Sequence, residues 1–477
     1  MRDTKFVWAA LLTLAACSGG GAAVSSSAGG TGSQLSGSTP TATPTPKPPT
    51  PAPTKSGAPP TPTPSPTSSP TQAPIGQYIK HVVIVVQENR SFDNMFAGFP
   101  GADTAQSGLM SNGKTEPLQP VGLEAQTDID HSHSNWVKQY AGGKMYFDLG
   151  SPGNPTLPYA YVPQAETQPL WSLAEQYGLA DRMFQSNTGP SFAAHQYLIA
   201  ATSQVGSLYA DDNPYYANFT PIPITGSWGC DAPSGAFLTM LNPNGGPDLV
   251  GPFPCINNTT VADELAAKGV SWREYAPAIG SAGGSWSAFD AIKHIRYGPG
   301  WKSVVSPETT VLTDAPAGNV ASVTWVIPTG KNSDHSGNGS TTGPQWVASV
   351  VNAFGTSPQW NSTAIFILWD DWGGWYDHVV PPQLDAMGLS FRVPLIVVSP
   401  YARHGYVSHV QHEEGSILRF IEDDFGLARL AASDSRADNL QDFFDFSQQP
   451  ARFHAIAVKR SPASFFHAPE LSAPDNE

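Results

Sequence analysis

The sequence predicts an α/β fold in which a doubly wound, mostly parallel sheet is flanked by helices. Two apolar runs, Val82 to Val86 and Ala364 to Leu368, contain no polar residue and therefore predict strands that are buried on both faces. Helical stretches alternate with such strands along the chain, which is typical of doubly wound sheets. Polar residues follow both runs within two positions, at the edge where open α/β sheets bind their ligands.

The amino-terminal part of the chain has the composition of an export signal. Residues 1–17 carry Arg2 and Lys5 before an apolar run that is too short to cross a bilayer, and small residues precede Cys17. The sequence Leu-Ala-Ala-Cys resembles the bacterial lipoprotein signal, which implies that Cys17 is a lipid-modified membrane anchor. The alternative is an ordinary secretory signal cleaved near Cys17. Both kinds of signal predict an exported protein, and the lipoprotein signal places it on the cell envelope or outer surface.

Residues 18–77 are rich in Gly, Ser, Thr and Pro and contain almost no large apolar side chain. We expect them to form a disordered tether, because they cannot bury enough surface to fold. Residues 78–477 have the length of one large folded domain. The formal charge of −15 argues against nucleic acid as a partner, since no basic patch is present to neutralise phosphates.

The predicted elements after the first strand keep the alternation of an α/β sheet. The helix predicted from Glu414 to Phe425 places Ile417, Phe420 and Ile421 on one face. The predicted helices are Pro169 to Tyr177, Ala193 to Ala201, Val261 to Gly269 and Glu414 to Phe425, and further strands are Ser322 to Ile327 and Val393 to Ser399.

Two cysteines, Cys230 and Cys255, accompany a segment rich in Gly, Pro and Asn that runs from Ser207 to Pro254. In an exported protein we expect them to form a disulfide, and two free buried thiols are the alternative. A zinc site would need more Cys or His residues close by. The segment itself is either a substrate lid or a loop.

Carboxylates and an amide follow the two buried strands. Asp370 and Asp371 follow one apolar run after Trp369, and Glu88 and Asn89 follow the other after Gln87. Two adjacent buried carboxylates repel each other, so a metal ion between them is the simplest explanation. The alternative for the Asp pair is a helix cap followed by a solvated side chain.

Ser191 and several histidines are further candidates. Ser191 precedes a predicted helix, where a serine is usually a cap, yet the same position suits a nucleophile that attacks an anionic phosphate. A single histidine would ordinarily be structural or exposed. His335 is a stronger candidate because it also follows a predicted strand. The candidate histidines are His131, His294 and His335.

The residues from Ile79 to Asp93 closely resemble the opening motif of a bacterial phosphoesterase family. This family contains phosphatidylcholine-type phospholipases C and a group of acid phosphatases, and it is related in fold to the alkaline phosphatases. Later blocks resemble it in the same order and cover most of the folded part: Asp128 to His131, Gln185 to Ser191, His294 to Pro299, Ser333 to His335, Trp369 to Gly374, Arg392 to Pro394 and Ser399 to Tyr401.

The resemblance implies an alkaline-phosphatase-like fold and a role for each candidate. Ser191 matches the nucleophile, which also lies at the metal, and the three histidines His131, His294 and His335 match residues around the phosphate. His133 and His378 rank below these as structural residues, and Asp377 could orient one of them. The metal-binding positions are matched by Glu88, Asn89, Asp370 and Asp371, and the family implies a divalent metal whose identity the sequence does not give.

The sequence therefore predicts an exported, membrane-anchored phosphoesterase, with residues 78–477 as its catalytic domain. The expected substrate is a phospholipid or another phosphate ester, cleaved at a phosphodiester bond in the manner of a phospholipase C. One alternative is a phosphomonoesterase of the acid phosphatase type. The other is an inactive surface module that binds glycans or lipids through some of the 13 tryptophans.

Overall fold

The structure of this chain is a computed structural model, and it describes residues 74–124, 127–216 and 218–467. All of these belong to one compact unit, Pro70–Glu477. The predicted signal with Cys17 and nearly all of the predicted tether lie outside the described residues. Within the described part of the chain, no helix is long and apolar enough to span a membrane.

An eight-stranded sheet forms the centre of this unit. Its strands are parallel except β18, which runs antiparallel to both of its neighbours, so the prediction of a mostly parallel sheet is confirmed. The strand order is β15 (Val304–Val305), β14 (Trp272–Tyr275), β16 (Val323–Val326), β1 (His81–Gln87), β17 (Thr363–Trp369), β18 (Leu395–Val398), β6 (Gly178–Ala180) and β19 (Tyr406–Ser408).

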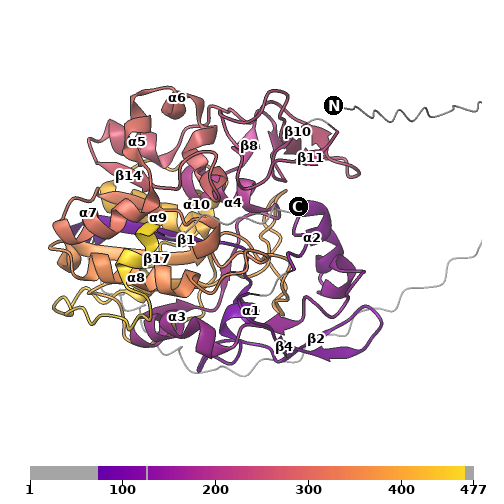
Figure 1. The fold of residues 1–477 in the computed structure, drawn as a ribbon, viewed down its shortest axis with the longest axis horizontal. Helices are drawn as coiled ribbons and strands as arrows, with labels where there is room; N and C mark the ends of the chain where they lie inside the picture. The colour runs from indigo at the N-terminus through magenta and orange to yellow at the C-terminus, as the bar shows by residue number, and fades with distance from the viewer. Residues whose placement is uncertain (1–73, 125–126, 217, 468–477) are drawn as a thin grey trace, which may run out of the picture. The chain divides into compact units, whose positions relative to one another are not determined.

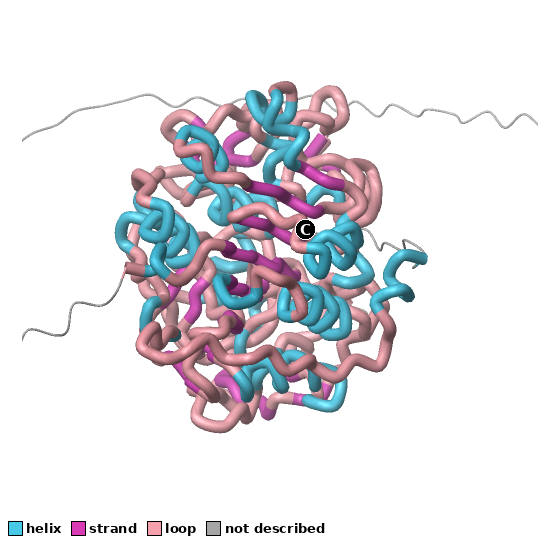
Figure 2. Tube along the Cα trace, turned by 90° about the vertical axis from the view of Figure 1, so that its left-hand side faces the viewer, coloured by secondary structure: helices cyan, strands magenta, loops and turns pink. Residues whose placement is uncertain are grey.

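Helices cover both faces of the sheet (Figures 1 and 2). One group packs around α8; it comprises α3 (Gln164–Gln176), α7 (Val311–Ala317) and α8 (Gly343–Gly355). The other group packs around α9 and comprises α4 (Ser191–Ala200), α5 (Val261–Ala267), α9 (Glu414–Phe425) and α10 (Ala432–Arg436). The sheet is therefore doubly wound, as predicted.

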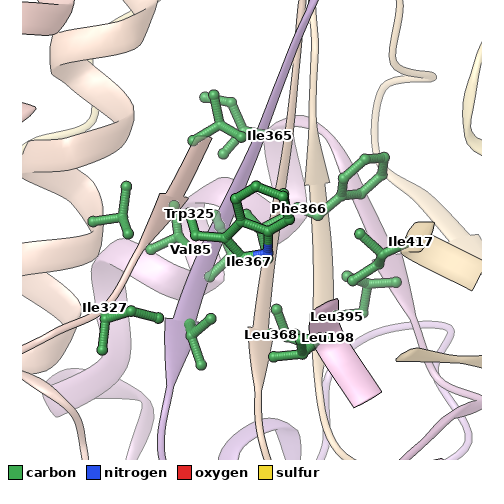
Figure 3. Packing of buried hydrophobic residues seen from close by; sticks show 14 of the residues in the cluster. Val85, Leu198, Trp325, Ile327, Ile365, Phe366, Ile367, Leu368, Leu395 and Ile417 are labelled. Atoms are coloured by element: carbon green, nitrogen blue, oxygen red, sulfur yellow. The ribbon is translucent and has the colours of Figure 1, made fainter. Parts of the chain in front are cut away.

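The central strands are buried because both of their faces carry apolar side chains (Figure 3). Val85 of β1, Trp325 of β16 and Ile367 of β17 are at most 1% exposed. Phe366 lies on the same side of the sheet as Ile417 of α9, and its ring packs edge-on against a ring of that helix. Each fully buried side chain of this size stabilises the fold by about 1.5–3 kcal/mol, which holds the strand ends in place.

Smaller elements complete this unit. Before α3 lie α1 (Phe92–Phe96), β2 (Ser107–Leu109), β3 (Thr115–Pro117), β4 (Gln119–Pro120), α2 (His133–Tyr140) and β5 (Ala160–Tyr161). After it lie β7 (Met183–Phe184), α6 (Lys293–Arg296) and β20 (His412–Glu413), of which β7 and β20 pair in parallel.

The segment from Ser207 to Pro254 forms short hairpins. Its strands, with one strand just before it, are β8 (Gln204–Val205), β9 (Leu208–Tyr209), β10 (Tyr215–Tyr216), β11 (Thr220–Pro221), β12 (Thr239–Met240) and β13 (Leu249–Val250). Cys230 and Cys255 form a disulfide, as predicted.

Candidate functional site

The ends of β1 and β17 bring two pairs of polar residues together. These strands pair in parallel with Gln87 opposite Trp369, so the residues that follow lie side by side. The backbone N–H of Asn89 donates to Asp370 Oδ1 over 3.0 Å. Glu88, Asn89, Asp370 and Asp371 are all fully buried, so this edge of the sheet holds carboxylates that water does not solvate.

The backbone at this edge adopts an uncommon conformation. Asn89 has a φ of +61°, in the left-handed region that side chains other than glycine rarely enter. Gly373, with a φ of +60°, lies against it, and a Cβ at this glycine would sit 2.1 Å from the backbone oxygen of Asn89. The glycine is therefore required for the close approach, and strain of this kind is concentrated at functional sites.

Ser191 is the first residue of α4, and its side chain points into the same cluster. Its Oγ donates to Asp371 Oδ2 over 3.3 Å, and it is fully buried. The N-cap of the helix is Pro190, which makes no side-chain capping hydrogen bond, and Asn213 Oδ1 instead accepts from the backbone N–H of Phe192 over 2.8 Å. Ser191 thus does not serve as the cap that its sequence position alone would suggest.

Two of the predicted histidines converge on Asn89. Its Nδ2 lies 2.5 Å from His131 Nε2 and 3.2 Å from His335 Nε2. Each ring donates its other nitrogen, Nδ1, to a carbonyl of its own loop over 2.6 Å. Because a carbonyl oxygen can only accept, Nδ1 carries a proton in each ring, and Nε2 is the ring atom that faces Asn89. Burial lowers the pKa of His131 to about 4, which agrees with a neutral ring.

His294 is the predicted residue that the structure does not bring into this cluster. Its side chain is 39% exposed, with Nδ1 2.7 Å from Asn257 Oδ1 and Nε2 2.9 Å from Asp263 Oδ1. Asp263 belongs to α5, so the short helix α6 presents this histidine to a neighbouring helix. A motif that matches in sequence carries no information about which way a side chain points, and this is why the prediction placed His294 at the phosphate.

His195 joins the cluster although the sequence analysis did not select it. Its Nε2 lies 3.2 Å from Glu88 Oε1 and 3.5 Å from Asp370 Oδ2. It stands one helical turn after Ser191 on α4, and residues four apart share one face of a helix. The spacing Ser-x-x-x-His was therefore the signal that could have identified it.

The cluster leaves two oxygen atoms without a hydrogen-bond donor among the described residues. These atoms are Glu88 Oε2 and Asn89 Oδ1, while Asp370 Oδ2 has the contact with His195 Nε2 over 3.5 Å. One ligand atom each from Glu88, His195 and Asp370 lies within 4.8 Å of the other two. Buried acceptors that have no donor are costly, and a hard cation would satisfy them. The residues present therefore fit a divalent metal ion.

Comparison with known proteins agrees with this geometry. The phosphoesterase family model matches residues 79–428. The chain belongs to the phosphoesterase family. This family match spans every residue of the cluster and confirms the family that the sequence blocks predicted.

Two phospholipases C are among the similar proteins of known function. The chain is 23% identical over 407 residues to a non-hemolytic phospholipase C from Pseudomonas aeruginosa, covering 73% of this chain and 54% of that protein. It is 23% identical over 447 residues to phospholipase C B from Mycobacterium tuberculosis, covering 78% of each. The chain thus spans about half the length of the Pseudomonas protein.

Among solved structures, the chain is similar to a protein in the alkaline phosphatase superfamily from Vibrio parahaemolyticus. The identity is 10% and the TM-score 0.37, with 77% of this chain and 72% of that chain covered.

His195 interacts strongly with the carboxylates of Glu88 and Asp370. Burial alone would lower the pKa of His195, but Glu88 and Asp370 raise it to about 10. Burial and the neighbouring Asp370 raise the pKa of Glu88 well above its usual range. Burial also acts to raise the pKa of Asp370, but hydrogen bonding and charge from His195 outweigh it and lower the value to about 2. A positive charge is thus strongly favoured at this point.

The lower-ranked candidates make other contacts. His133 Nδ1 lies 2.9 Å from the hydroxyl oxygen of Thr188. Asp377 accepts from Arg392 Nε over 2.9 Å, and His378 Nδ1 lies 2.6 Å from Asp93 Oδ2. These contacts agree with the structural roles that the sequence analysis gave them.

Proposed function

We propose that the chain hydrolyses phosphoester bonds in the manner of a phospholipase C, with a phospholipid as the substrate. The hydrogen bond from Ser191 Oγ to Asp371 Oδ2, inside the buried cluster, carries this proposal. This hydrogen bond gives the Ser191 hydroxyl an acceptor, Asp371, for its proton. Ser191 also lies at the N-terminus of α4, and helix N-termini attract phosphate groups. The phospholipase C relatives from two bacteria support a phosphodiester as the substrate.

Ser191 acts as the nucleophile in this proposal. Asp371 Oδ2 takes the proton as Oγ attacks phosphorus, and the bond from phosphorus to the leaving alcohol breaks. The headgroup phosphate then remains on the serine. In a second step water attacks phosphorus and gives a proton to the histidine that protonated the leaving alcohol, while the bond between Oγ and phosphorus breaks and the proton returns from Asp371 to Ser191 Oγ.

His131 and His335 bind the phosphate and supply the proton for the leaving alcohol. Their Nε2 atoms are the ring atoms that face the cluster. Since burial lowers the pKa of His131 to about 4, the ring needs the negative charge of the bound phosphate to hold a proton. His294, exposed and bonded to Asp263, has no part in this step.

Glu88, Asn89, Asp370 and Asp371 would hold the divalent metal, together with the Ser191 hydroxyl, and the geometry adds His195 to this set. When bound, the metal would neutralise charge on the phosphate oxygens and lower the pKa of the serine hydroxyl. Asp371 Oδ1 also accepts from the backbone N–H of Gly373 over 2.7 Å, which fixes the carboxylate that orients Ser191.

Replacing the nucleophile tests this mechanism. We expect Ser191→Ala to lower the turnover of p-nitrophenylphosphorylcholine by at least about 1,000-fold. Ser191→Thr should keep part of the turnover because a hydroxyl remains. Ser172→Ala on α3 is the matched control and should leave turnover unchanged. Wild-type turnover in Ser191→Ala would refute the assignment. A higher kcat/KM on p-nitrophenyl phosphate than on the diester would favour the phosphomonoesterase alternative.

We also propose that the enzyme is exported and anchored to the cell envelope through a lipid on Cys17. The sequence of residues 1–17 supports this, and the tether of residues 18–77 would give the catalytic domain reach. Cys17→Ser should move the protein from the membrane fraction to the soluble fraction. An unchanged membrane fraction would refute the lipid anchor.

A further inference from the structure

The segment from Ser207 to Pro254 contacts the start of α4, the helix that carries Ser191. Asn213 Oδ1 accepts from the backbone N–H of Phe192 over 2.8 Å, although the two residues are 21 positions apart in the chain. The segment also approaches the loop before the helix, since a Cβ at Gly189 would lie 2.6 Å from the backbone oxygen of Asp211. A segment that the sequence predicts as a lid or a loop is therefore packed beside Ser191.

The Asn213 side chain has a fixed place in this contact. It is 2% exposed, and the backbone N–H of Asn213 donates to Asp212 Oδ1 over 2.8 Å. The hydroxyl of Tyr215 donates to the other oxygen of Asp212, Oδ2, over 3.3 Å. Tyr215 belongs to β10 and also pairs with Phe237, so the hairpins of the segment set the position of Asn213.

A second residue of the same segment also reaches α4. Trp228 is 2% exposed and lines, with Ser191 and His195, a cavity of about 10 Å³, which has room for about one water molecule. The indole Nε1 of Trp228 donates to the backbone oxygen of Ile222 over 2.7 Å, which fixes the ring. Because Ser191 and His195 share one face of α4, the tryptophan lies close to the face that enters the buried cluster.

Asn213 satisfies a backbone group that the helix itself cannot satisfy. The first N–H groups of a helix have no acceptor within the helix, and Phe192 is the second residue of α4. Pro190 makes no side-chain capping hydrogen bond, so the acceptor comes from Asn213. Asparagine is among the residues that best stabilise helix N-termini. The hydrogen bond therefore fixes the first turn of α4, from which Ser191 Oγ reaches Asp371.

We propose that Asn213 is a positioning residue for the reaction: it holds the first turn of α4 and thereby keeps Ser191 Oγ at Asp371. The segment from Ser207 to Pro254 serves to place Asn213 and Trp228 against this turn, and it is not a lid that leaves the site. The inference rests on the proposed function for the role of Ser191. A reacting group displaced by about 1 Å loses roughly 100-fold in rate, so a small shift of the helix start has a large effect.

The activity test separates positioning of the nucleophile from binding of the substrate. We expect Asn213→Ala to lower kcat for p-nitrophenylphosphorylcholine by about 100-fold and to leave KM within about threefold, because the lost contact acts on the nucleophile. Asn213→Asp keeps an oxygen acceptor for the N–H of Phe192 and should stay within about tenfold of the wild-type kcat. Wild-type kcat in Asn213→Ala, or equal losses in both variants, would overturn the inference.

Thr260→Ala is the matched control, because Thr260 and Asp263 form the capping box of α5, a helix that contributes no side chain to the buried cluster. Loss of either cap should lower the unfolding midpoint by about 2–4 °C. Thr260→Ala should nevertheless keep kcat within roughly twofold of wild type. A loss of kcat in Thr260→Ala as large as that in Asn213→Ala would assign the effect to general destabilisation and overturn the positioning role.

Hydrogen exchange of the full chain, followed by mass spectrometry, tests the contact without any substrate. Peptides that span the start of α4 should exchange about five- to tenfold faster in Asn213→Ala than in wild type, and at the wild-type rate in Asn213→Asp and Thr260→Ala. Unchanged exchange in Asn213→Ala would overturn the inference and leave the proposed function intact. Absence of hydrolysis by wild type would refute the proposed function, and the exchange rates would still decide whether Asn213 holds the helix start.

Discussion

Two buried clusters of carboxylates and histidine lie around the stretch from Trp369 to His378, and they differ in how their charge is balanced. Each brings three ligand atoms within 4.8 Å of one another. In the arginine cluster, a guanidinium is built in, whereas in the open cluster oxygen atoms remain without donors among the described residues. The arginine cluster comprises Asp93, Asp377, His378 and Arg392, and the open cluster comprises Glu88, Asn89, His195 and Asp370.

The comparison shows why similar residues have different roles. Arg392 is fully buried, and its guanidinium donates to Asp377 and to the backbone oxygens of Asp103 and Asp181. A cluster whose cation belongs to the chain holds segments of the fold together. The open cluster has no guanidinium, and the contacts of His195 leave Glu88 Oε2 and Asn89 Oδ1 without donors among the described residues, so these oxygen atoms are free to bind a metal.

The largest expected effect comes from breaking the arginine cluster. Arg392→Met leaves Asp93 and Asp377 buried without their counterion, and we expect the free energy of unfolding to fall by roughly 3–5 kcal/mol. Urea unfolding followed by tryptophan fluorescence measures this change. The double variant Arg392→Met with Asp377→Asn should recover part of the loss. If the single variant unfolds like wild type, the cluster does not hold the fold together.

In the open cluster, a substitution should reduce metal binding more than it reduces stability. Asp370→Asn removes a charge that the metal needs, so we expect metal binding to weaken by more than about 100-fold and turnover to fall with it. Elemental analysis and titration of the apoprotein measure the metal, and without metal the loss of stability should be smaller than in Arg392→Met because His195 keeps its contact with Glu88. Full metal content in this variant would show that Asp370 is not a ligand. A chelator should likewise abolish turnover, and added divalent metal should restore it.

The sequence was sufficient to predict the convergence of Glu88, Asn89, Asp370 and Asp371, because parallel strands end at one edge of a sheet. The position of Ser191 followed from the helix that it begins. The arginine cluster could not be predicted, since Asp93 and Arg392 lie far apart in the chain and only the fold brings them together. The orientation of His294 was equally invisible, because α6 is too short for its apolar pattern to define a buried face.

His195 offers a finer test of the open cluster. Its Nε2 contacts both Glu88 and Asp370, so we expect His195→Gln to weaken metal binding by about 10- to 100-fold, less than the loss of a carboxylate. His409→Gln is the matched control, because that ring is 62% exposed and contacts Asp181 instead. Metal titration of both variants separates them. Equal affinities would mean that His195 is a counterion of Glu88 and Asp370 and not a metal ligand.

The smallest effect is the pH dependence of stability that His378 adds to the arginine cluster. Burial acts to lower the pKa of His378, but the hydrogen bond and charge of Asp93 outweigh it and raise the pKa above the usual value. A histidine with a raised pKa stabilises the fold fully below the unfolded-state pKa of about 6.5 and loses that contribution as the pH rises through the folded-state pKa.

We therefore expect His378→Gln to be less stable than wild type at pH 5.5, by at most about 1 kcal/mol because the side chain is partly solvated, and the difference to shrink above neutral pH. Urea unfolding of both proteins from pH 5.5 to 9 measures it. His454→Gln controls for an exposed histidine and should show no such trend. A difference that grows with rising pH would have the wrong sign, and it would mean that the neutral ring, not the imidazolium, is the form that Asp93 holds in the folded protein.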